Sequence, residues 1–407
     1  MTGAGTGLER TAFWLLAACL GVVQFNLLTA QALFIVAGVL WLVVAARAPR
    51  RPSLPAFARP LGVYAALTVA SALVSLDPVR SLIDSRQLLL FLMVPMVTQL
   101  CTGARATRTI DVIIALGSAG ALVGIVQYAV FGYDDLTRRP VGALSHYMTY
   151  SGVLMLVTAA ALARLLYHRR EWIWPAIAVP ALVVAIAATF ARSAWVGTLA
   201  AAGTLLGLRR PRLLWLLPAV AVVGLVIAPS GIRDRAYSIF DVNNPTNRDR
   251  IAMLDIGSRI VADHPVFGVG PEMVKDVYAE YRPDYAVNPT NPHLHNVPMQ
   301  IAAERGLVAL GAWLWFVVVA GRDLFRQLAA GRAPAVAGAG LAALVAMLAA
   351  GLFEYNFGDS EFLMLFLGLL ALPHAAASGA AVSADDTTPP AADRGARSTA
   401  PTAGASA

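Results

Sequence analysis

The chain of 407 residues is 58% hydrophobic and only 14% charged, whereas soluble domains contain roughly 25% charged residues. This composition excludes an ordinary soluble protein and, because apolar runs long enough to cross a bilayer recur along the chain, predicts a polytopic helical membrane protein. The formal net charge of +7 does not indicate nucleic-acid binding, since the arginines lie in short groups between apolar runs rather than along one stripe.

The first part of the chain is predicted to cross the membrane twice, starting from the cytoplasm. Arg10 followed by an apolar run could mimic a signal peptide. A second apolar run follows almost at once without a typical cleavage site, so we expect the first helix to be retained. The two helices are predicted at residues 11–28 and 30–46. The basic stretch after them marks the cytoplasmic side by the positive-inside rule, and its arginines are Arg47, Arg50, Arg51 and Arg59.

The later apolar runs continue this alternation, with a short outer loop at residues 77–86 and arginines in the loops that should be cytoplasmic, among them Arg169 and Arg170. The remaining helices are predicted at residues 60–76, 87–101, 110–131, 148–166, 172–190, 193–208, 213–228, 298–320, 335–353 and 362–373. The fold class is therefore all-α, with about twelve transmembrane helices. No internal repeat of the inverted-transporter kind is visible. Cys19 and Cys101 lie in apolar runs and predict neither a disulfide nor a metal site.

Counting the spans places one large polar segment on the outer face. The predicted parts are transmembrane residues 1–229, a loop domain at 230–297, transmembrane residues 298–374 and a disordered cytoplasmic tail at 375–407. Within the loop domain, apolar residues at helical spacing predict a helix at 250–262, capped by residues 247–249. The pair His264-Pro265 should end that helix, and a second short helix is predicted at 271–281.

A histidine followed by an asparagine stands at the end of the loop domain. Imidazole is the side chain best able to accept a proton from a sugar hydroxyl near neutral pH, which makes His295 a candidate base, and Asn296 could orient it or bind a hydroxyl. A structural role in capping the next helix fits the position equally well. In an extended segment His293 would point elsewhere, and no Cys, Glu or further His stands nearby at zinc-ligand spacing, so no metal site is predicted.

Arginines expected at the outer face could bind phosphate. Arg192 lies at the tight turn in FARSAW and Arg250 begins the predicted loop helix. The planar guanidinium suits bidentate contacts to phosphate, so converging arginines could hold a diphosphate without a metal ion. Arg192 could instead be an interfacial anchor, Arg250 could be solvated or salt-bridged, and Arg248 competes with Arg250 for the same role. Weaker candidates are Arg80, Arg86, Arg138 and Arg139.

Polar residues also gather where the last two predicted helices meet. Acidic groups at a membrane boundary are costly unless paired or hydrated, so this cluster is a functional candidate. Asp359 or Glu354 could orient a histidine or pair with an arginine, although a solvated loop would look the same. The cluster consists of Glu354, Tyr355, Asn356, Asp359 and Glu361.

Four stretches of the chain together resemble the O-antigen ligase and O-antigen polymerase superfamily of bacterial envelope proteins. They are FARSAW, RIAMLDIGSRIVADHPVFGVG, HLHNVPMQIAAERGLVALG and FEYNFGDSE. The most specific element is His295-Asn296 followed, after nine residues, by Gly306. Ala309 stands where the family often has glycine, threonine or valine, and Leu254 where tryptophan is common; these departures bear on the choice between ligase and polymerase.

The resemblance implies an integral-membrane glycosyltransferase of the bacterial inner membrane whose site faces the periplasm. The donor would be a glycan on undecaprenyl diphosphate and the acceptor a sugar hydroxyl of lipid A-core. His295 would be the base, while Arg192 and Arg250 would bind the diphosphate, and Asn296 and Asp359 are further substrate-binding candidates. The reaction would need no metal or other cofactor and would invert the anomeric carbon.

Three other readings remain open from the sequence. A polymerase would use the same donor but lengthen chains on the lipid carrier. A transporter of lipid-linked sugars should show charges or broken helices at the membrane midplane, and these are scarce. A non-catalytic assembly protein would need no chemistry at His295.

Overall fold

The computed structural model describes residues 3–48, 53–168 and 171–385, and these residues form helices and connecting segments without strands. The all-α fold class is confirmed. The helices are α1 (Gly3–Val22), α2 (Leu27–Arg47), α3 (Ala58–Leu73), α4 (Pro78–Asp84), η1 (Ser85–Leu92), α5 (Met93–Leu100), α6 (Ala104–Ala129), α7 (Tyr147–Tyr167), α8 (Ile173–Ala188), α9 (Arg192–Arg209), η3 (Pro211–Trp215), α10 (Leu216–Ile227), α11 (Ser230–Tyr237), α12 (Pro245–Asp263), α13 (Val274–Tyr281), α14 (Val297–Ala329), α15 (Pro334–Ala350), η4 (Asn356–Gly358) and α16 (Ser360–Asp385). The arginines predicted to be cytoplasmic at positions 50, 51, 169 and 170, and residues 386–407 of the predicted tail, lie outside the described residues.

Several helices have the length and composition of membrane spans. Among the described residues, six helical stretches are long and apolar enough to cross a bilayer: Leu27–Arg47, Pro78–Leu100, Ala104–Ala129, Tyr147–Tyr167, Val297–Ala329 and Ser360–Ser378. Four further apolar helical stretches are shorter. No residue of α10 is buried, although that helix is almost entirely apolar. Such a surface suits lipid rather than water, so the chain is a multi-pass membrane protein, and the total of twelve spans stays a prediction.

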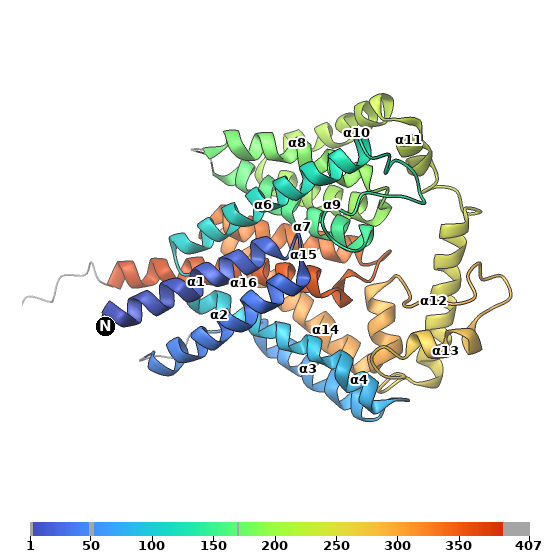
Figure 1. Cartoon of the computed structure of the whole chain (residues 1–407), viewed down its shortest axis with the longest axis horizontal. Coiled ribbons are helices and arrows are strands. Elements are labelled where there is room, and N and C mark those ends of the chain that lie inside the picture. Colours follow the sequence, from blue (N-terminus) through green and yellow to red (C-terminus); the bar gives the residue numbers. More distant parts are fainter. Residues whose placement is uncertain (1–2, 49–52, 169–170, 386–407) are drawn as a thin grey trace, which may run out of the picture.

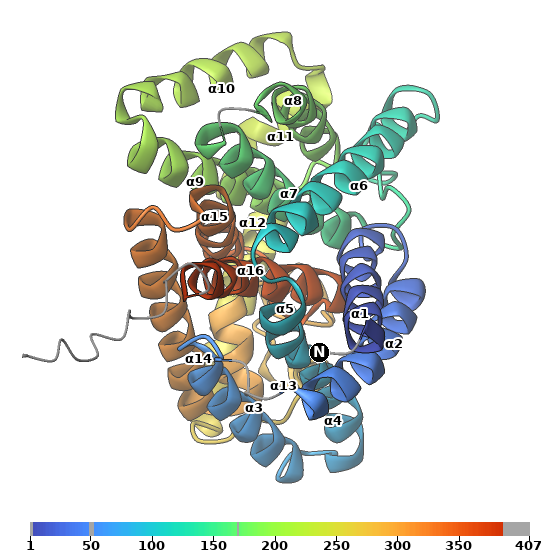
Figure 2. The same ribbon diagram turned by 90° about the vertical axis from the view of Figure 1, so that its left-hand side faces the viewer.

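The centre of the molecule is formed by α7, α15 and α16. In α16 the side chains from Phe362 to Leu367 are at most 2% exposed, and Figure 2 shows this helix surrounded by α1, α5, α14 and α15. The polar helices α12 and α13 lie together at one end of the molecule, opposite the N-terminus (Figure 1). The fold therefore gathers the predicted loop domain at a single end of the helix bundle.

The boundary between the first two helices was predicted several residues too late. The first helix ends at Val22 and the second begins at Leu27. The reason is Asn26, whose side-chain oxygen accepts a hydrogen bond from the backbone N–H of Thr29 at 2.8 Å. This bond satisfies one of the unpaired donors at the start of α2, which fixes the helix start there.

The expected outer loop at residues 77–86 is wrong, because α4 occupies it. Asp77 caps this helix by accepting a hydrogen bond from the N–H of Arg80 at 3.1 Å. Pro78 follows in the first helical turn, where its fixed φ suits a helix start and its missing N–H costs nothing. The chain continues through η1 into α5, so the predicted span at 87–101 begins as a 3-10 helix.

The loop domain contains more helix than predicted. The first predicted loop helix starts earlier, at Pro245, because Asn244 caps it by accepting from the N–H of Thr246, and α11 was not predicted. The second starts only at Val274.

The tail was predicted to lack structure from residue 375, but α16 runs to Asp385. This segment is rich in alanine, the best helix former, so it continues the preceding helix.

The helix after the loop domain is broken at Gly306, which has φ +79° and ψ 170°. The backbone of the HPVFGVG stretch fills the break: the N–H of Leu307 donates to the carbonyl of Pro265 at 2.8 Å. On the other side of the break, the N–H of Gly270 donates to the carbonyl of Glu304 at 2.8 Å. The glycine of the His-Asn motif is thus a docking point that fixes the loop domain to α14.

Replacing Gly306 by alanine is expected to destabilise the fold. A Cβ there would lie 1.9 Å from the carbonyl oxygen of Val266, and the left-handed backbone is itself unfavourable for alanine, so the expected cost is about 2–5 kcal/mol. Gly311→Ala is the matched control in the same helix, because nothing lies within 4 Å of its Cβ position. Thermal unfolding in detergent measures both variants, and equal melting temperatures would contradict the docking role of Gly306.

Candidate active site

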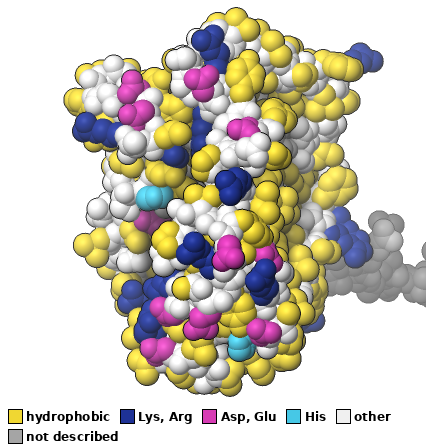
Figure 3. Space-filling model, turned by 90° about the vertical axis from the view of Figure 1, so that its right-hand side faces the viewer, with side chains coloured by type: hydrophobic (Ala, Val, Ile, Leu, Met, Phe, Trp, Pro, Cys, Tyr) yellow, Lys and Arg dark blue, Asp and Glu magenta, His cyan; other side chains and the backbone are white. Residues whose placement is uncertain are grey.

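A cavity of about 290 Å³ opens where the loop domain meets α9 and the ends of α14 and α15. Four residues singled out in the sequence line it: Arg192, Arg250, His295 and Asn296. Most other lining residues are apolar: Val196, Ile239, Val242, Ile251, Leu254, Leu294, Leu352 and Phe353. Figure 3 views this end of the molecule and shows charged side chains gathered on it. The cavity thus combines cationic and imidazole groups with an apolar wall.

His295 forms the best-defined polar contact of the cavity. Its Nδ1 lies 2.8 Å from a carboxylate oxygen of Glu354, and the Glu354 side chain is 5% exposed. The backbone N–H of Tyr355 donates to the same oxygen at 3.0 Å. A carboxylate acceptor assigns the ring proton to Nδ1 and leaves the lone pair of Nε2 free to accept a proton. Glu354 is therefore the acidic residue that orients the histidine.

The expectation that His293 points away from His295 is wrong. Its ring centroid lies 4.6 Å from that of His295, and its Nε2 is 3.8 Å from the same oxygen of Glu354. The reason is the alternation of side chains along an extended segment, which places residues two apart in the sequence on the same side. The two imidazoles therefore share one carboxylate.

The pKa values of Glu354 and His293 are both lowered, each for a reason that the contacts explain. Burial alone would raise the pKa of Glu354, but the neighbouring His295 and His293 and the hydrogen bonds outweigh it, so the pKa is lowered. Burial and the adjacent His295 lower the pKa of His293 to about 4. Glu354 is therefore a carboxylate at neutral pH and His293 is uncharged.

Asn296 and the residue after it connect the cavity to α14 and to the segment that follows α15. Its side-chain oxygen caps α14 by accepting from the N–H of Met299 at 2.8 Å, and its Nδ2 donates to the carbonyl of Leu352 at 3.1 Å. The N–H of Val297 donates to the carbonyl of Gly351 at 2.7 Å. The asparagine thus joins the start of α14 to the segment that carries Glu354.

Arg192 is held beneath the loop domain by neutral partners. One guanidinium nitrogen donates to the carbonyl of Ser238 at 2.8 Å and another to the side-chain oxygen of Asn247 at 2.6 Å. The residue is 5% exposed, and among the described residues it forms no salt bridge. A buried cation without a carboxylate partner is unfavourable, so its charge is available for an anionic ligand.

Of the two neighbouring arginines on α12, only Arg250 faces the cavity. Its guanidinium carbon lies 5.9 Å from the ring centroid of Phe353, and burial lowers its pKa despite the attraction of Glu354. Arg248 is exposed and approaches the carbonyl of Tyr285 at 3.5 Å. Asp249 does not pair with Arg250, because it accepts hydrogen bonds from Asn288 and Asn291. The geometry therefore favours Arg250 over Arg248 as the cavity arginine.

A further buried arginine, Arg235 on α11, was not singled out in the sequence. It is 8% exposed, and its Nε donates to the carbonyl of Phe190 at 3.2 Å. Burial and the charges of Arg192, Arg139 and Arg250 lower its pKa to about 10. It sits in a short helix with two other charged residues, a pattern typical of a solvated segment, so only the fold reveals its place in the cluster.

The weaker arginine candidates lie outside the cavity lining. Arg80 pairs with Asp276 at 3.0 Å, Arg86 is exposed, and Arg138 packs over the ring of Tyr133. Arg139 packs over Tyr147, with its guanidinium carbon 4.1 Å from the ring centroid. Only Arg139 is close enough to Arg192 and Arg235 to lower their pKa values in part.

Asp359 does not line the cavity. One of its carboxylate oxygens accepts a hydrogen bond from the hydroxyl of Thr149 at 2.9 Å. Burial and the nearby carboxylates Glu354 and Glu361 raise its pKa to about 7, although the Thr149 hydrogen bond and His295 oppose the shift. The geometry therefore links Asp359 to α7 rather than to the cavity.

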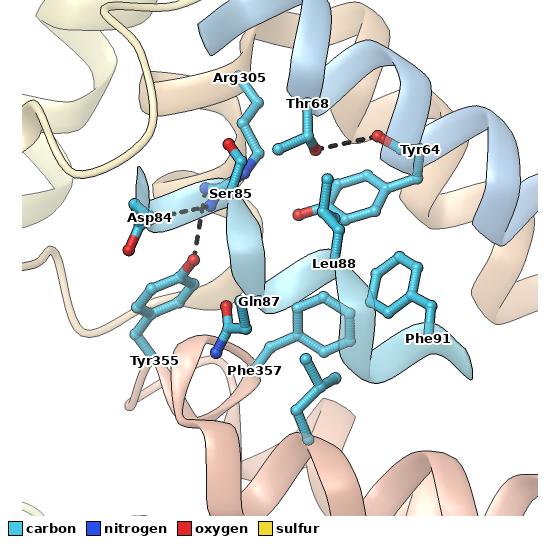
Figure 4. A pocket seen from close by; sticks show the side chains of 11 residues that line it. Tyr64, Thr68, Asp84, Ser85, Gln87, Leu88, Phe91, Arg305, Tyr355 and Phe357 are labelled. Atoms are coloured by element: carbon cyan, nitrogen blue, oxygen red, sulfur yellow. Dashed lines mark hydrogen bonds and ion pairs between the residues drawn. The ribbon is translucent and has the colours of Figure 1, made fainter. Parts of the chain in front are cut away.

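A second, much smaller pocket is lined by Arg305, Asp84 and Tyr355 among others (Figure 4). Its volume of about 20 Å³ holds no more than a water-sized molecule. Arg305 reaches the hydroxyl of Tyr355 at 3.4 Å and a carboxylate oxygen of Asp84 at 4.0 Å. Because Tyr355 follows Glu354 directly, this pocket contributes to the placement of the carboxylate and offers no room for a sugar.

Comparison with protein families identifies part of the chain. Residues 177–314 match the family model described as O-antigen ligase. This match supports the O-antigen ligase superfamily that the motifs predict. The matched segment includes Arg192, Arg250 and His295, whereas Glu354 and Asp359 lie beyond it. The match supports a function of the O-antigen ligase or polymerase type. A search of the curated proteins found no match.

The arginine cluster leads to a testable expectation for Arg235. Arg235→Ala should raise the KM for a lipid-diphosphate donor about tenfold, because removing a nearby positive charge weakens the attraction for phosphate by roughly 1.4 kcal/mol. Arg233→Ala is the matched control, since Arg233 lies on the same helix and is exposed. Arg235→Lys, which keeps the charge, should recover most of the affinity. An unchanged KM in a folded Arg235→Ala protein would remove Arg235 from the site.

Proposed function

We propose that the protein is an O-antigen ligase that transfers a glycan from undecaprenyl diphosphate to a sugar hydroxyl of lipid A-core at the periplasmic face of the inner membrane. The observation that carries this proposal is the meeting of His295, paired with Glu354, and two arginines in one cavity. The family match and the apolar cavity wall, which suits a lipid-linked substrate, add to it.

In the proposed reaction, Nε2 of His295 takes the proton of the acceptor hydroxyl. The acceptor oxygen then forms a bond to the anomeric carbon while the bond from that carbon to the phosphate oxygen breaks. Undecaprenyl diphosphate leaves with the bonding electron pair, and attack from the opposite side inverts the anomeric centre. Glu354 stabilises the imidazolium through Nδ1–H, as a carboxylate does in a catalytic triad.

The arginines would act on the leaving group. Diphosphate gains negative charge as the glycosidic bond breaks, and guanidinium groups fixed in a poorly hydrated cavity favour that charge more than water does. Arg192 is already held by hydrogen bonds and Arg250 lies over the ring of Phe353, so little reorganisation is needed when the charge develops. With this arrangement the step requires no metal ion and no nucleotide.

The test is transfer in vitro with the purified full-length protein in lipid nanodiscs. The assay contains lipid-diphosphate glycan, lipid A-core and a chelator. A ligase attaches preformed glycan to lipid A-core under these conditions. Longer chains on the lipid carrier would instead identify a polymerase, and movement of the donor without any new glycosidic bond would identify a transporter. Absence of both products and movement would overturn the proposal.

A further inference from the structure

Two histidines and a carboxylate converge beside the cavity, and one of them, His295, lines it. One ring nitrogen of His293, one ring nitrogen of His295 and a carboxylate oxygen of Glu354 all lie within 4.8 Å of one another. His295 Nδ1 is 2.8 Å and His293 Nε2 is 3.8 Å from the same Glu354 oxygen. Two neutral imidazoles and one carboxylate form the donor set of several protein zinc sites.

The spacing fits a tetrahedral ion. Ligand bonds of about 2.0–2.2 Å place two ligands of one zinc ion roughly 3.3 Å apart, and the two measured separations of 2.8 and 3.8 Å lie on either side of that value. The set favours zinc over magnesium or calcium, which prefer oxygen ligands.

A second observation points to a ligand at this place. The other carboxylate oxygen of Glu354, Oε2, is buried and has no hydrogen-bond partner among the described residues, although the residue is only 3% exposed. A buried unpaired carboxylate oxygen is unfavourable, and a cation bound by both oxygens of the carboxylate would give Oε2 a partner. The His293 side chain is 32% exposed, which leaves the cluster open to ions from the outer aqueous phase.

We propose that His293, His295 and Glu354 form a site for Zn²⁺, and that Zn²⁺ bound there inhibits the enzyme. The existence of the metal site does not depend on the proposed function. The inhibition rests on the proposed function, because it requires His295 to be the base.

The inhibition follows from the two ring nitrogens of His295. Without metal, Nδ1 carries the proton and Nε2 is free to accept the proton of the acceptor. When Nδ1 binds Zn²⁺ it must give up its proton, and a neutral imidazole then carries its single proton on Nε2. The nitrogen that should accept a proton has become a donor, and the charge of the ion also opposes protonation of the ring.

Binding is tested with Co²⁺, whose visible absorption reports tetrahedral coordination. The sample is the full-length protein in nanodiscs with any affinity tag removed. The wild type should develop the tetrahedral spectrum and lose it when Zn²⁺ is added, whereas His293→Ala should bind more than about tenfold more weakly. His264→Ala, which changes another loop histidine, should bind like the wild type. Absence of the spectrum in the wild type, or equal binding by His293→Ala, would overturn the site.

Inhibition is tested in the transfer assay, with Zn²⁺ added and then removed by chelator. We expect Zn²⁺ to stop transfer by the wild type reversibly, and His293→Ala to transfer like the wild type without metal but to resist Zn²⁺. Equal sensitivity of both proteins, or activation by Zn²⁺, would refute the inhibitory role. A wild type that transfers no glycan even with chelator would refute the proposed function instead, and the Co²⁺ spectrum would still decide the metal site.

Discussion

His295→Ala is expected to reduce glycan transfer by about 10²–10⁴-fold, the range that a positioned general base contributes. The loss should appear in kcat, because the donor diphosphate is bound by arginines that the change does not touch. The backbone of His295 is left-handed, so His295→Asn, a residue that tolerates this conformation, should be made alongside alanine. Single-turnover transfer with saturating donor measures the effect.

The neighbouring His293 provides the control for that experiment. It lies against the same carboxylate, so His293→Ala disturbs the surroundings of Glu354 to a similar extent but leaves the pair of His295 with Glu354 intact. In metal-free buffer it should transfer glycan like the wild type. If both variants transfer normally and fold normally, the base is not His295, and a non-catalytic assembly role gains support.

The sequence motifs predicted the cavity residues but not how they come together. Arg192, Arg250, His295 and Asn296 stand in recognisable motifs, and the structure brings all four to one cavity. Arg192, His295 and Asn296 stand at or next to helix ends, and the sequence predicts from charge and hydropathy alone that these ends lie at the outer face. Their convergence depends on the docking of the loop domain at Gly306, which spacing does not encode.

The choice between Glu354 and Asp359 could not be made from the sequence. Both follow α15 within a few residues, and only the path of the turn decides that Glu354 meets His295 while Asp359 meets Thr149. For His293, the alternation of side chains in an extended segment already places it on the same side as His295. The meeting of both rings at one carboxylate oxygen and the path of the turn are tertiary properties, so periodicity and composition cannot contain them.

Helix boundaries were missed for a different reason, since their signals were present in the sequence. Asn26 before α2, Asp77-Pro78 before α4 and Asn244-Pro245 before α12 are ordinary capping patterns. Asn26 and Asp77 stand inside or beside long apolar runs, and the length of an apolar run does not show where its helix begins. In membrane segments, capping residues therefore give better boundaries than the edges of apolar runs.

Arg250→Ala is expected to reduce kcat/KM for the lipid-diphosphate donor by about 10²–10³-fold, as removal of one group that stabilises transition-state charge does. The side chain makes no hydrogen bond or salt bridge among the described residues, and its guanidinium carbon lies 5.9 Å from the ring centroid of Phe353, so the loss should come from the substrate and not from unfolding. Arg192→Lys should also reduce kcat/KM for the donor, but by a smaller factor. It keeps the charge but cannot reproduce the planar contacts to Ser238 and Asn247.

Arg248→Ala is the matched control, because it removes the same charge two residues away on the face of α12 that points outside the cavity. If net positive charge at this end of the molecule were all that mattered, Arg248→Ala and Arg250→Ala would lose donor affinity equally and both losses would vanish at high salt, since exposed charges are screened. A clamp inside the cavity predicts a loss for Arg250 alone that persists in salt, because water and ions are largely excluded there. Equal effects would therefore reject the diphosphate clamp while leaving the role of His295 untouched.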